Sequence, residues 1–163
     1  LFLDEIGDCP PDLQVRLLRV LDQGEIRRVG ENRPRRIDVR VLAATHHDLE
    51  QDMRNGRFRE DLFYRLNVLT IEVPPLRERG EDIPVLACSF LDHFNAVKGK
   101  VVAGFSDAAL DALHACRFPG NIRELENEIE RAHALTPEGE VIGPEGFSPR
   151  VTAGFRSTGP KQG

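Results

Sequence analysis

The chain opens with an apolar segment that ends in two adjacent carboxylates. Leu1–Leu3 is followed at once by Asp4 and Glu5. Large apolar residues in an unbroken run are typical of a strand buried on both faces of a parallel sheet. In open α/β sheets, ligands bind beyond the carboxyl ends of the strands, which is where the two acids would lie. The alternative is an acidic helix start, because Asp8 and two prolines follow directly.

A pair of acids at a sheet edge suits the hydrolysis of a nucleotide. One carboxylate, Asp4, can hold Mg²⁺ directly or through water, and its neighbour, Glu5, can orient or deprotonate the attacking water. The first prediction is therefore an α/β protein with a nucleotide site at the edge marked by these two residues.

Composition narrows the class of protein. The 163 residues are 40% hydrophobic and 30% charged, which predicts a soluble globular chain of one large domain or two small ones. No apolar run approaches the roughly 18 residues of a membrane span. Three cysteines and five histidines stand in no metal-binding spacing, so reduced thiols in the cytoplasm are expected. Because the sequence starts inside a predicted strand and without Met, we expect a fragment of a longer protein.

The first part of the chain alternates helices and strands. A helix is predicted after Pro11 from leucines at helical spacing, and Gly24 should end it. A polar hairpin or loop should occupy 25–36. The other elements expected here are a buried strand at Val39–Ala44 running into Thr45, a short helix at 57–66, and a third strand at Val68–Val73.

Pro74 and Pro75 mark a boundary, beyond which only helical patterns are found. Ser106 is a predicted N-cap for the second of three helices. The stripe that should face the core of the first helix is Ile83, Leu86, Phe90, Leu91 and Phe94, and that of the third is Ile122, Leu125, Ile129 and Ala132. Gly, Pro, Ser and Thr dominate from Pro137, and residues 148–163 are predicted to be disordered.

Three arginines stand out. Arg123 lies in the first turn of a predicted helix, where the helix dipole disfavours a cation and free N–H groups favour a phosphate. A salt bridge to Glu126 or plain solvent exposure is the alternative. Arg59 and Arg65 are six residues apart, so on one helix they point in different directions and would address different objects. Pairing of these two with Glu60 and Asp61 is the ordinary alternative.

Taken together, the motifs resemble one family, the AAA+ domain of sigma-54-dependent transcriptional activators (bacterial enhancer-binding proteins of the NtrC type). The resemblance covers roughly residues 1–145. In chain order, the motifs that carry it are Leu1-Phe2-Leu3-Asp4-Glu5-Ile6-Gly7-Asp8, Arg19-Val20-Leu21 with Gly24-Glu25 and Arg28-Val29-Gly30, Phe58-Arg59-Glu60-Asp61-Leu62 with Tyr64-Arg65-Leu66-Asn67-Val68, Pro74-Pro75-Leu76-Arg77-Glu78-Arg79, and Phe118-Pro119-Gly120-Asn121-Ile122-Arg123-Glu124-Leu125-Glu126-Asn127.

The resemblance implies a role for each candidate residue. Asp4 and Glu5 look like the Walker B pair, serving Mg²⁺ and the hydrolytic water. Thr45 falls at sensor I, which senses the γ-phosphate of ATP. Arg59 and Arg65 look like arginine fingers that reach the nucleotide of a neighbouring subunit. Arg123 falls at sensor II. Residues 26–37 resemble a surface insertion that relays the nucleotide state, with direct DNA contact through Arg27 to Arg40 as a weaker possibility.

Some family features differ or are missing. His46 replaces the usual Asn after the sensor I Thr, and Phe118 replaces the usual Trp. The sequence contains no Gly-x-x-x-x-Gly-Lys-Ser/Thr phosphate loop, no Gly-Ala-Phe-Thr-Gly-Ala loop for the sigma factor and no helix-turn-helix segment. We therefore expect no appreciable ATPase activity from this chain alone.

The resulting prediction is the C-terminal part of an AAA+ P-loop NTPase. Its divisions are a partial α/β subdomain (1–76), a helical lid (77–143) and a flexible tail (144–163). The resemblance implies that the intact protein uses ATP and Mg²⁺ in a ring homo-oligomer, a hexamer, to remodel sigma-54 RNA polymerase holoenzyme into the open promoter complex. DNA would be bound through a domain outside this chain, and no membrane is involved. The alternative is an inactive truncated module for oligomerisation or protein interaction.

Overall fold

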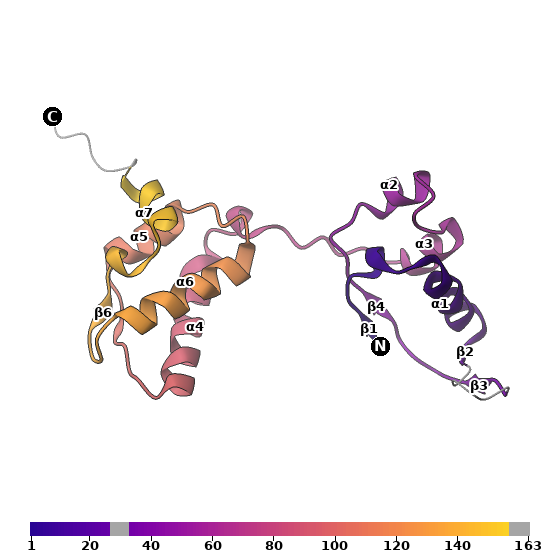
Figure 1. Ribbon diagram of the computed structural model, residues 1–163, viewed down its shortest axis with the longest axis horizontal. Coiled ribbons are helices and arrows are strands. Elements are labelled where there is room, and N and C mark those ends of the chain that lie inside the picture. Colours follow the sequence, from indigo (N-terminus) through magenta and orange to yellow (C-terminus); the bar gives the residue numbers. More distant parts are fainter. Residues whose placement is uncertain (27–32, 157–163) are drawn as a thin grey trace. The chain divides into compact units, whose positions relative to one another are not determined.

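The computed structural model describes residues 1–26 and 33–156, the last three by their backbone alone. The chain divides into two units, Leu1–Glu72 and Val73–Gly163. Figure 1 shows the first in indigo to purple and the second in rose to yellow. The first mixes short strands with helices and the second is mainly helical. Together they confirm the predicted α/β fold class with a helical part following it.

A pair of parallel strands organises the first unit. β1 (Phe2–Leu3) pairs with β4 (Leu42–Ala43), with Phe2 opposite Leu42. Backbone hydrogen bonds extend the pairing beyond the strands, since the Ile6 N–H donates to the Ala44 carbonyl at 3.0 Å. Because the strands are parallel, the residues that follow them meet at one edge of the sheet.

Helix α1 (Pro11–Gln23) follows a 3₁₀ turn, η1 (Ile6–Asp8). Pro11 occupies its first turn, where the missing N–H costs nothing. Gly24 ends it in the left-handed conformation (φ 61°), as predicted. Two further helices, α2 (Leu49–Arg54) and α3 (Glu60–Leu66), complete the unit. The buried residues of its core are Ile6, Leu17, Phe58, Leu62 and Phe63.

The two ends of the predicted hairpin segment are paired as strands. β2 (Glu25–Ile26) pairs antiparallel with β3 (Arg35–Arg36), with Glu25 opposite Arg36. The centre of the predicted 26–37 insertion, residues 27–32, lies outside the described part of the chain.

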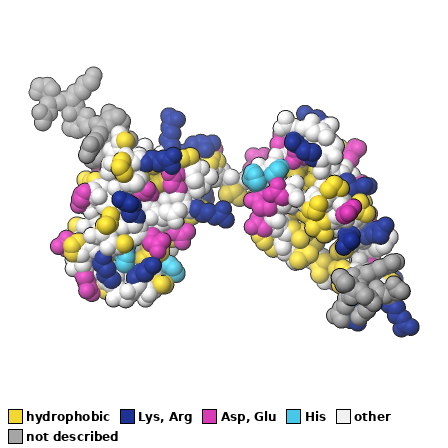
Figure 2. Space-filling view, viewed as in Figure 1, with side chains coloured by type: hydrophobic (Ala, Val, Ile, Leu, Met, Phe, Trp, Pro, Cys, Tyr) yellow, Lys and Arg dark blue, Asp and Glu magenta, His cyan; other side chains and the backbone are white. Residues whose placement is uncertain are grey.

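The strand predictions need correction. The segment Val68–Val73 forms no strand, and Val68 and Ile71 are 84% and 79% exposed. The second strand is shorter than the predicted Val39–Ala44, and Phe2 and Leu42 are more exposed than buried (61% and 57%). A strand requires hydrogen-bonding partners along its length, and no described segment pairs with residues 68–73. Nor does any described segment bury Phe2 and Leu42. Figure 2 shows hydrophobic side chains gathered on the visible surface of this unit.

The second unit is a helical bundle. Its elements are η2 (Leu76–Glu78), α4 (Asp82–Lys98), β5 (Gly104–Phe105), α5 (Asp107–Ala115), α6 (Asn121–Leu135), β6 (Val141–Ile142), η3 (Pro144–Gly146) and α7 (Pro149–Arg156). The parallel pair β5–β6 is an addition to the predicted helices. Ser106 caps α5 as predicted, since its Oγ accepts a hydrogen bond from the Ala109 N–H at 3.2 Å.

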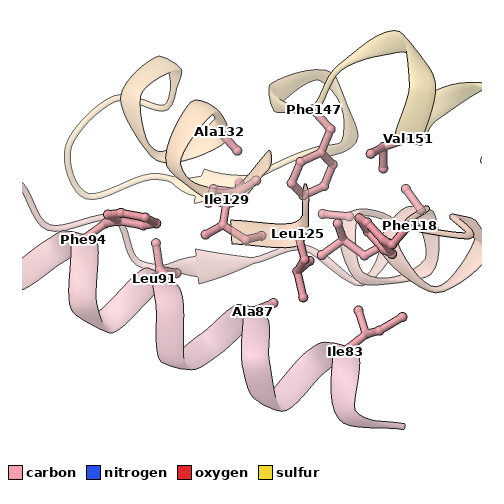
Figure 3. Packing of buried hydrophobic residues seen from close by; sticks show 14 of the residues in the cluster. Ile83, Ala87, Leu91, Phe94, Phe118, Leu125, Ile129, Ala132, Phe147 and Val151 are labelled. Carbon is pink, nitrogen blue, oxygen red and sulfur yellow. The ribbon is translucent and has the colours of Figure 1, made fainter. Parts of the chain in front are cut away.

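The predicted helix stripes form the core of this unit. Figure 3 shows Ile83, Leu91 and Phe94 of α4 pointing toward Leu125 and Ile129 of α6. All five are buried. The helical period of apolar residues identified the part of the core at which α4 and α6 pack together. Of the other predicted stripe residues, Leu86 and Phe90 are partly buried against this core, and Ile122 is not part of it.

The segment after residue 143 was predicted as a flexible tail, and over residues 144–156 this is wrong. Phe147 and Val151 are 4% and 1% exposed and belong to the core. The Ser148 N–H donates to Glu128 of α6 at 2.8 Å. Two apolar anchors are enough to fix a segment whose composition otherwise resembles a linker.

Phe118 gives the first testable prediction. Its ring is fully buried in the core of the second unit. Phe118→Ala should leave a cavity and lower the free energy of unfolding of this unit by about 3–5 kcal/mol. Amide hydrogen exchange in α4 and α6 measures this value. Val101→Ala, at a position 59% exposed, is the control and should change it by less than about 0.5 kcal/mol. A Phe118→Ala effect as small as that would show that the ring does not support the core.

Candidate functional site

The predicted acids and sensor lie at the same sheet edge. Asp4 and Glu5 follow β1, and Thr45 and His46 follow β4. The hydrogen bond from Ile6 to Ala44 holds the two strand ends together. The parallel pairing predicted from the sequence therefore brings Asp4, Glu5 and Thr45 into one neighbourhood.

Glu5 is held in an unusual way. Its backbone is in the left-handed region (φ 51°, ψ 48°), which is uncommon for a residue other than glycine and often marks functional sites. Its Oε2 lies 2.7 Å from His46 Nδ1. This hydrogen bond lowers the pKa of Glu5 below its usual value, so the carboxylate stays ionised. Glu5 precedes η1, but its side chain does not cap that turn, so the helix-start alternative does not explain its orientation.

Asp4 offers a carboxylate suited to a divalent cation. Its side chain is exposed, and within the described residues it forms no ion pair, its one hydrogen bond coming from the Glu5 N–H at 3.1 Å. No group of three or more His, Cys, Asp or Glu side chains in this part of the chain could hold a metal ion. Mg²⁺ in nucleotide sites is usually held by one or two carboxylates together with phosphates and water, so a single acid fits.

Thr45 packs tightly against the turn that follows Glu5. A Cβ at Gly7 would lie 2.7 Å from Thr45 Oγ1 and equally close to His47 Cγ, a separation that real Cβ atoms do not show. Only glycine fits between the turn and the end of β4. The Thr45 hydroxyl accepts a hydrogen bond from the His47 N–H at 3.1 Å, which fixes its rotamer.

A network of charges beside the site escaped the sequence analysis. His47 bridges two acids, with Nδ1 2.9 Å from Asp52 and Nε2 3.1 Å from Asp8. Asp52, only 5% exposed, also pairs with Arg57 at 2.7 Å. Acids five residues away or farther from a histidine give no readable signal in the sequence.

His47 also gives a pH prediction. Its hydrogen bonds to Asp52, and the charges of Asp8 and Asp52, raise the pKa of His47 above its ordinary value of 6.5. The folded state therefore holds the proton more tightly, so this stabilisation is complete below pH 6.5 and is lost as pH rises through the folded-state pKa. His47→Gln should flatten this decline. The measurement is urea unfolding followed by the single tyrosine, Tyr64, at a series of pH values. An unchanged pH slope would contradict the network's role.

The two candidate arginine fingers do not converge. Arg59 forms a two-point ion pair with Asp61 (2.7 and 3.0 Å), and Arg65 pairs with Asp22 of α1 at 3.1 Å. The ion-pair alternative therefore describes Arg59 within this chain. Hydrogen bonding to Asp61 raises the pKa of Arg59 and lowers that of Asp61, so both stay charged. Both guanidiniums are about half exposed, and exposed pairs of this kind exchange readily for another anion.

The segment before Arg59 borders a cleft of about 630 Å³. The residues that line this cleft are Pro11, Gln14, Gly56, Arg57, Phe58, Arg59, Glu60, Asp61 and Tyr64. Gln14 is a second residue that sequence analysis missed. It is 1% exposed and hydrogen-bonds the backbone of Arg57 and of Arg59, both of which line the cleft.

Arg123, in the second unit, is exposed and has no ion-pair or hydrogen-bond partner within the described residues. The predicted alternative of a salt bridge to Glu126 is absent there. Instead, Glu124 accepts a hydrogen bond from the Gly120 N–H at 2.7 Å and pairs with Arg150. The helix start therefore has an acid that complements its dipole, while the Arg123 guanidinium stays available to an anion.

Comparison with known families divides the chain as its two units do. Residues 1–72 match the family described as the Sigma-54 interaction domain, and residues 77–162 match the AAA+ ATPase lid domain. Within residues 1–26 and 33–156, no helix combines the length and apolar character that crossing a bilayer requires.

Individual relatives agree with this. The transcriptional regulatory protein ZraR of Salmonella typhimurium is 57% identical over 87% of the chain, and AlgB of Pseudomonas putida, an alginate biosynthesis transcriptional regulator, is 52% identical over 94%. The chain spans 32% and 36% of their lengths, about a third.

Solved structures show the same likeness. NtrX from Brucella abortus in complex with ADP superposes with a TM-score of 0.84 at 36% identity, covering 93% of this chain and 35% of NtrX. NtrX in complex with ATP gives 0.80 at 34% identity, with 93% and 36% covered. The motifs, the fold and these matches agree: the chain belongs to the sigma-54-dependent transcriptional activators and corresponds to the C-terminal part of their AAA+ domain.

Proposed function

We propose that this chain is the catalytic and lid portion of an ATP-hydrolysing transcription activator that remodels sigma-54 RNA polymerase holoenzyme into the open promoter complex. One observation carries the proposal: the ionised Glu5, the Asp4 carboxylate, which has no ion pair among the described residues, and the hydroxyl of Thr45 lie at one edge of a parallel sheet. That is the position at which α/β sheets bind ligands.

The residues divide the work of hydrolysis. Asp4 would hold Mg²⁺, which together with its water shell neutralises charge on the phosphates of ATP. Glu5 would orient and deprotonate the attacking water, and Thr45 would offer its hydroxyl to the terminal phosphate. Arg123, which has no partner among the described residues, would bind phosphate through its guanidinium. The complexes of NtrX with ADP and with ATP support a nucleotide as the ligand.

Arg59 and Arg65 are assigned to the nucleotide of the neighbouring subunit. Within the described part of its own chain, Arg59 pairs with Asp61 and Arg65 pairs with Asp22, and neither forms an ion pair with Asp4 or Glu5. A homo-oligomeric ring, a hexamer, would let each subunit complete the site of the next. Promoter or enhancer DNA would bind through a domain outside this chain, and the protein would work in the cytoplasm.

The division of labour follows the two units. We assign the first unit, Leu1–Glu72, to the partial α/β subdomain predicted over residues 1–76, and the second unit to the lid. The lid extends past residue 143 to include α7, because Phe147 and Val151 are part of its core.

The proposal is tested by joining this chain to a segment that supplies a phosphate loop. The 163-residue chain alone should show no detectable ATP hydrolysis, because it contains no phosphate loop to bind the nucleotide. Substituted for the matching third of ZraR, next to that protein's own upstream segment, it should support ATP hydrolysis. Robust turnover by the isolated chain would contradict the first expectation.

The chimera also distinguishes the second candidate. A non-enzymatic module for oligomerisation or protein interaction is favoured by the absence of the phosphate loop from these 163 residues. A chimera that folds and oligomerises but hydrolyses no ATP would support that module over the ATPase.

A further inference from the structure

Gln14 is almost completely buried, and every hydrogen-bonding group of its amide is used. Its Nε2 donates to the Cys9 carbonyl at 2.8 Å and to the Arg57 carbonyl at 3.0 Å. Its Oε1 accepts from the Arg59 N–H at 2.9 Å. One side chain from α1 therefore joins two loops that lie more than 40 residues apart in the sequence.

The first of these loops is the turn that begins at Glu5. The Asp8 N–H donates to the Glu5 carbonyl at 3.0 Å, and the Cys9 N–H donates to the Ile6 carbonyl at 3.2 Å. Gln14 then binds the Cys9 carbonyl. The turn from Glu5 to Cys9, which we call the acid turn, is thus closed by its own hydrogen bonds and is joined to Gln14 at its last residue.

The second loop ends at Arg59, the residue before α3. The Arg59 carbonyl accepts the first hydrogen bond of the helix, from the Phe63 N–H at 3.0 Å. The Arg59 N–H points the other way along the chain, and Gln14 Oε1 accepts its hydrogen bond. Arg57, two residues before Arg59, is held in addition by Asp52, whose backbone carbonyl accepts from the Arg57 N–H at 2.8 Å and whose carboxylate pairs with its guanidinium.

We propose that Gln14 is a positioning residue that fixes the arginine finger Arg59 relative to the turn carrying Glu5 of the same subunit. The inference rests on the proposed function, in which Arg59 acts on the neighbour's nucleotide. In each subunit, the position of Arg59 is then set by the acid turn of that same subunit. Since a misplacement of about 1 Å can cost 10²-fold in rate, loss of this link should lower turnover by about 10²-fold.

The hydrogen bonds between Gln14 and the Arg59 loop can be tested directly, without measuring ATP hydrolysis. In the 163-residue chain, Gln14→Met keeps the length of the side chain and removes all three hydrogen bonds. Amide hydrogen exchange at Arg59 should become faster, while the amides of α4 and α6 in the second unit should be unchanged. Retained protection at Arg59 would overturn the proposal.

Mixed assemblies test the functional consequence. In the ZraR chimera, subunits with Gln14→Met have an intact acid site but deliver a misplaced finger. Mixed with Glu5→Gln subunits, whose fingers are intact, they should regain turnover, as Arg59→Ala subunits should under the same mixing. Mixed with Arg59→Ala subunits they should gain nothing, because neither partner supplies a correctly placed finger.

The outcomes separate the two levels of inference. If Arg59→Ala is not rescued by Glu5→Gln subunits, the finger in trans, and with it the proposed function, fails. If Arg59→Ala is rescued and Gln14→Met is not, only the role of Gln14 fails. Should Gln14→Met not fold, Gln14→Glu keeps the acceptor for Arg59 and loses both donors to the loops, and the same rescue pattern is expected.

The chain also provides a matched control. Asn95 clamps the backbone of Val102 in the second unit with two hydrogen bonds, at 2.9 and 3.1 Å. Asn95→Leu removes a comparable side-chain clamp far from Arg59 in the sequence. Any loss of turnover it causes should not be rescued by Glu5→Gln subunits. Equal rescue of both variants would overturn the specific role of Gln14.

Discussion

Replacing Glu5 by Gln in the ZraR chimera should leave ATP binding intact and lower hydrolysis by about 10²–10⁴-fold, the usual contribution of a general base. The amide keeps the size of the side chain and its ability to hydrogen-bond His46, so the fold of the site should persist. What it loses is the negative charge, which His46 keeps on Glu5 by holding its pKa low.

Two measurements check this result, equilibrium binding of a fluorescent ATP analogue and steady-state release of phosphate. Glu50→Gln makes the same chemical change at an exposed acid on α2 that pairs with Arg54, and it should leave both values unchanged. Unimpaired hydrolysis by the Glu5→Gln protein would remove Glu5 from the role proposed for it.

Arg59→Ala should have the largest effect of any single change, a loss of about 10³–10⁵ in turnover, which is the contribution of an arginine finger supplied by a neighbour. The ion pair with Asp61 that the substitution breaks lies at the surface, so the fold should be little affected. The affinity for ATP should change far less than the turnover, because the finger stabilises charge that develops in the transition state.

The control for Arg59→Ala is Arg54→Ala, which removes another exposed arginine with an acidic partner from the same unit. Turnover is measured against subunit concentration, because a group acting between subunits matters only in the assembled ring. If Arg59→Ala hydrolyses ATP as fast as the unsubstituted chimera, the assignment of Arg59 fails even where Glu5 retains its role.

The helical unit was the more predictable half of the fold. Ile83, Leu91 and Phe94, and then Leu125 and Ile129, repeat at the helical period, and each stripe needs only one neighbour to bury it. Strands were harder, because Val68–Val73 has the apolar character of a strand but finds no pairing segment in the described chain. The segment with Phe147 and Val151 was missed for the opposite reason, since two apolar residues among Gly, Pro and Ser carry no period.

The sequence by itself determined which residues to consider at the site. Local order pointed to the acid pair Asp4 and Glu5 at a strand end, and the resemblance of the motifs to a known family added Thr45 and the roles of the arginines. Helices and turns depend on neighbours a few residues away, so such patterns remain legible in one dimension.

Only the tertiary structure decided how those residues are held. His46 meets Glu5 across 41 positions, and Gln14 meets Arg59 across 45. A hydrogen bond depends on distance and direction in space, and a polar side chain such as Gln14 looks the same in sequence whether it is solvated or buried. The physical reason is that burial turns each polar atom into a group that must find a partner, and folding alone determines which partner lies within reach.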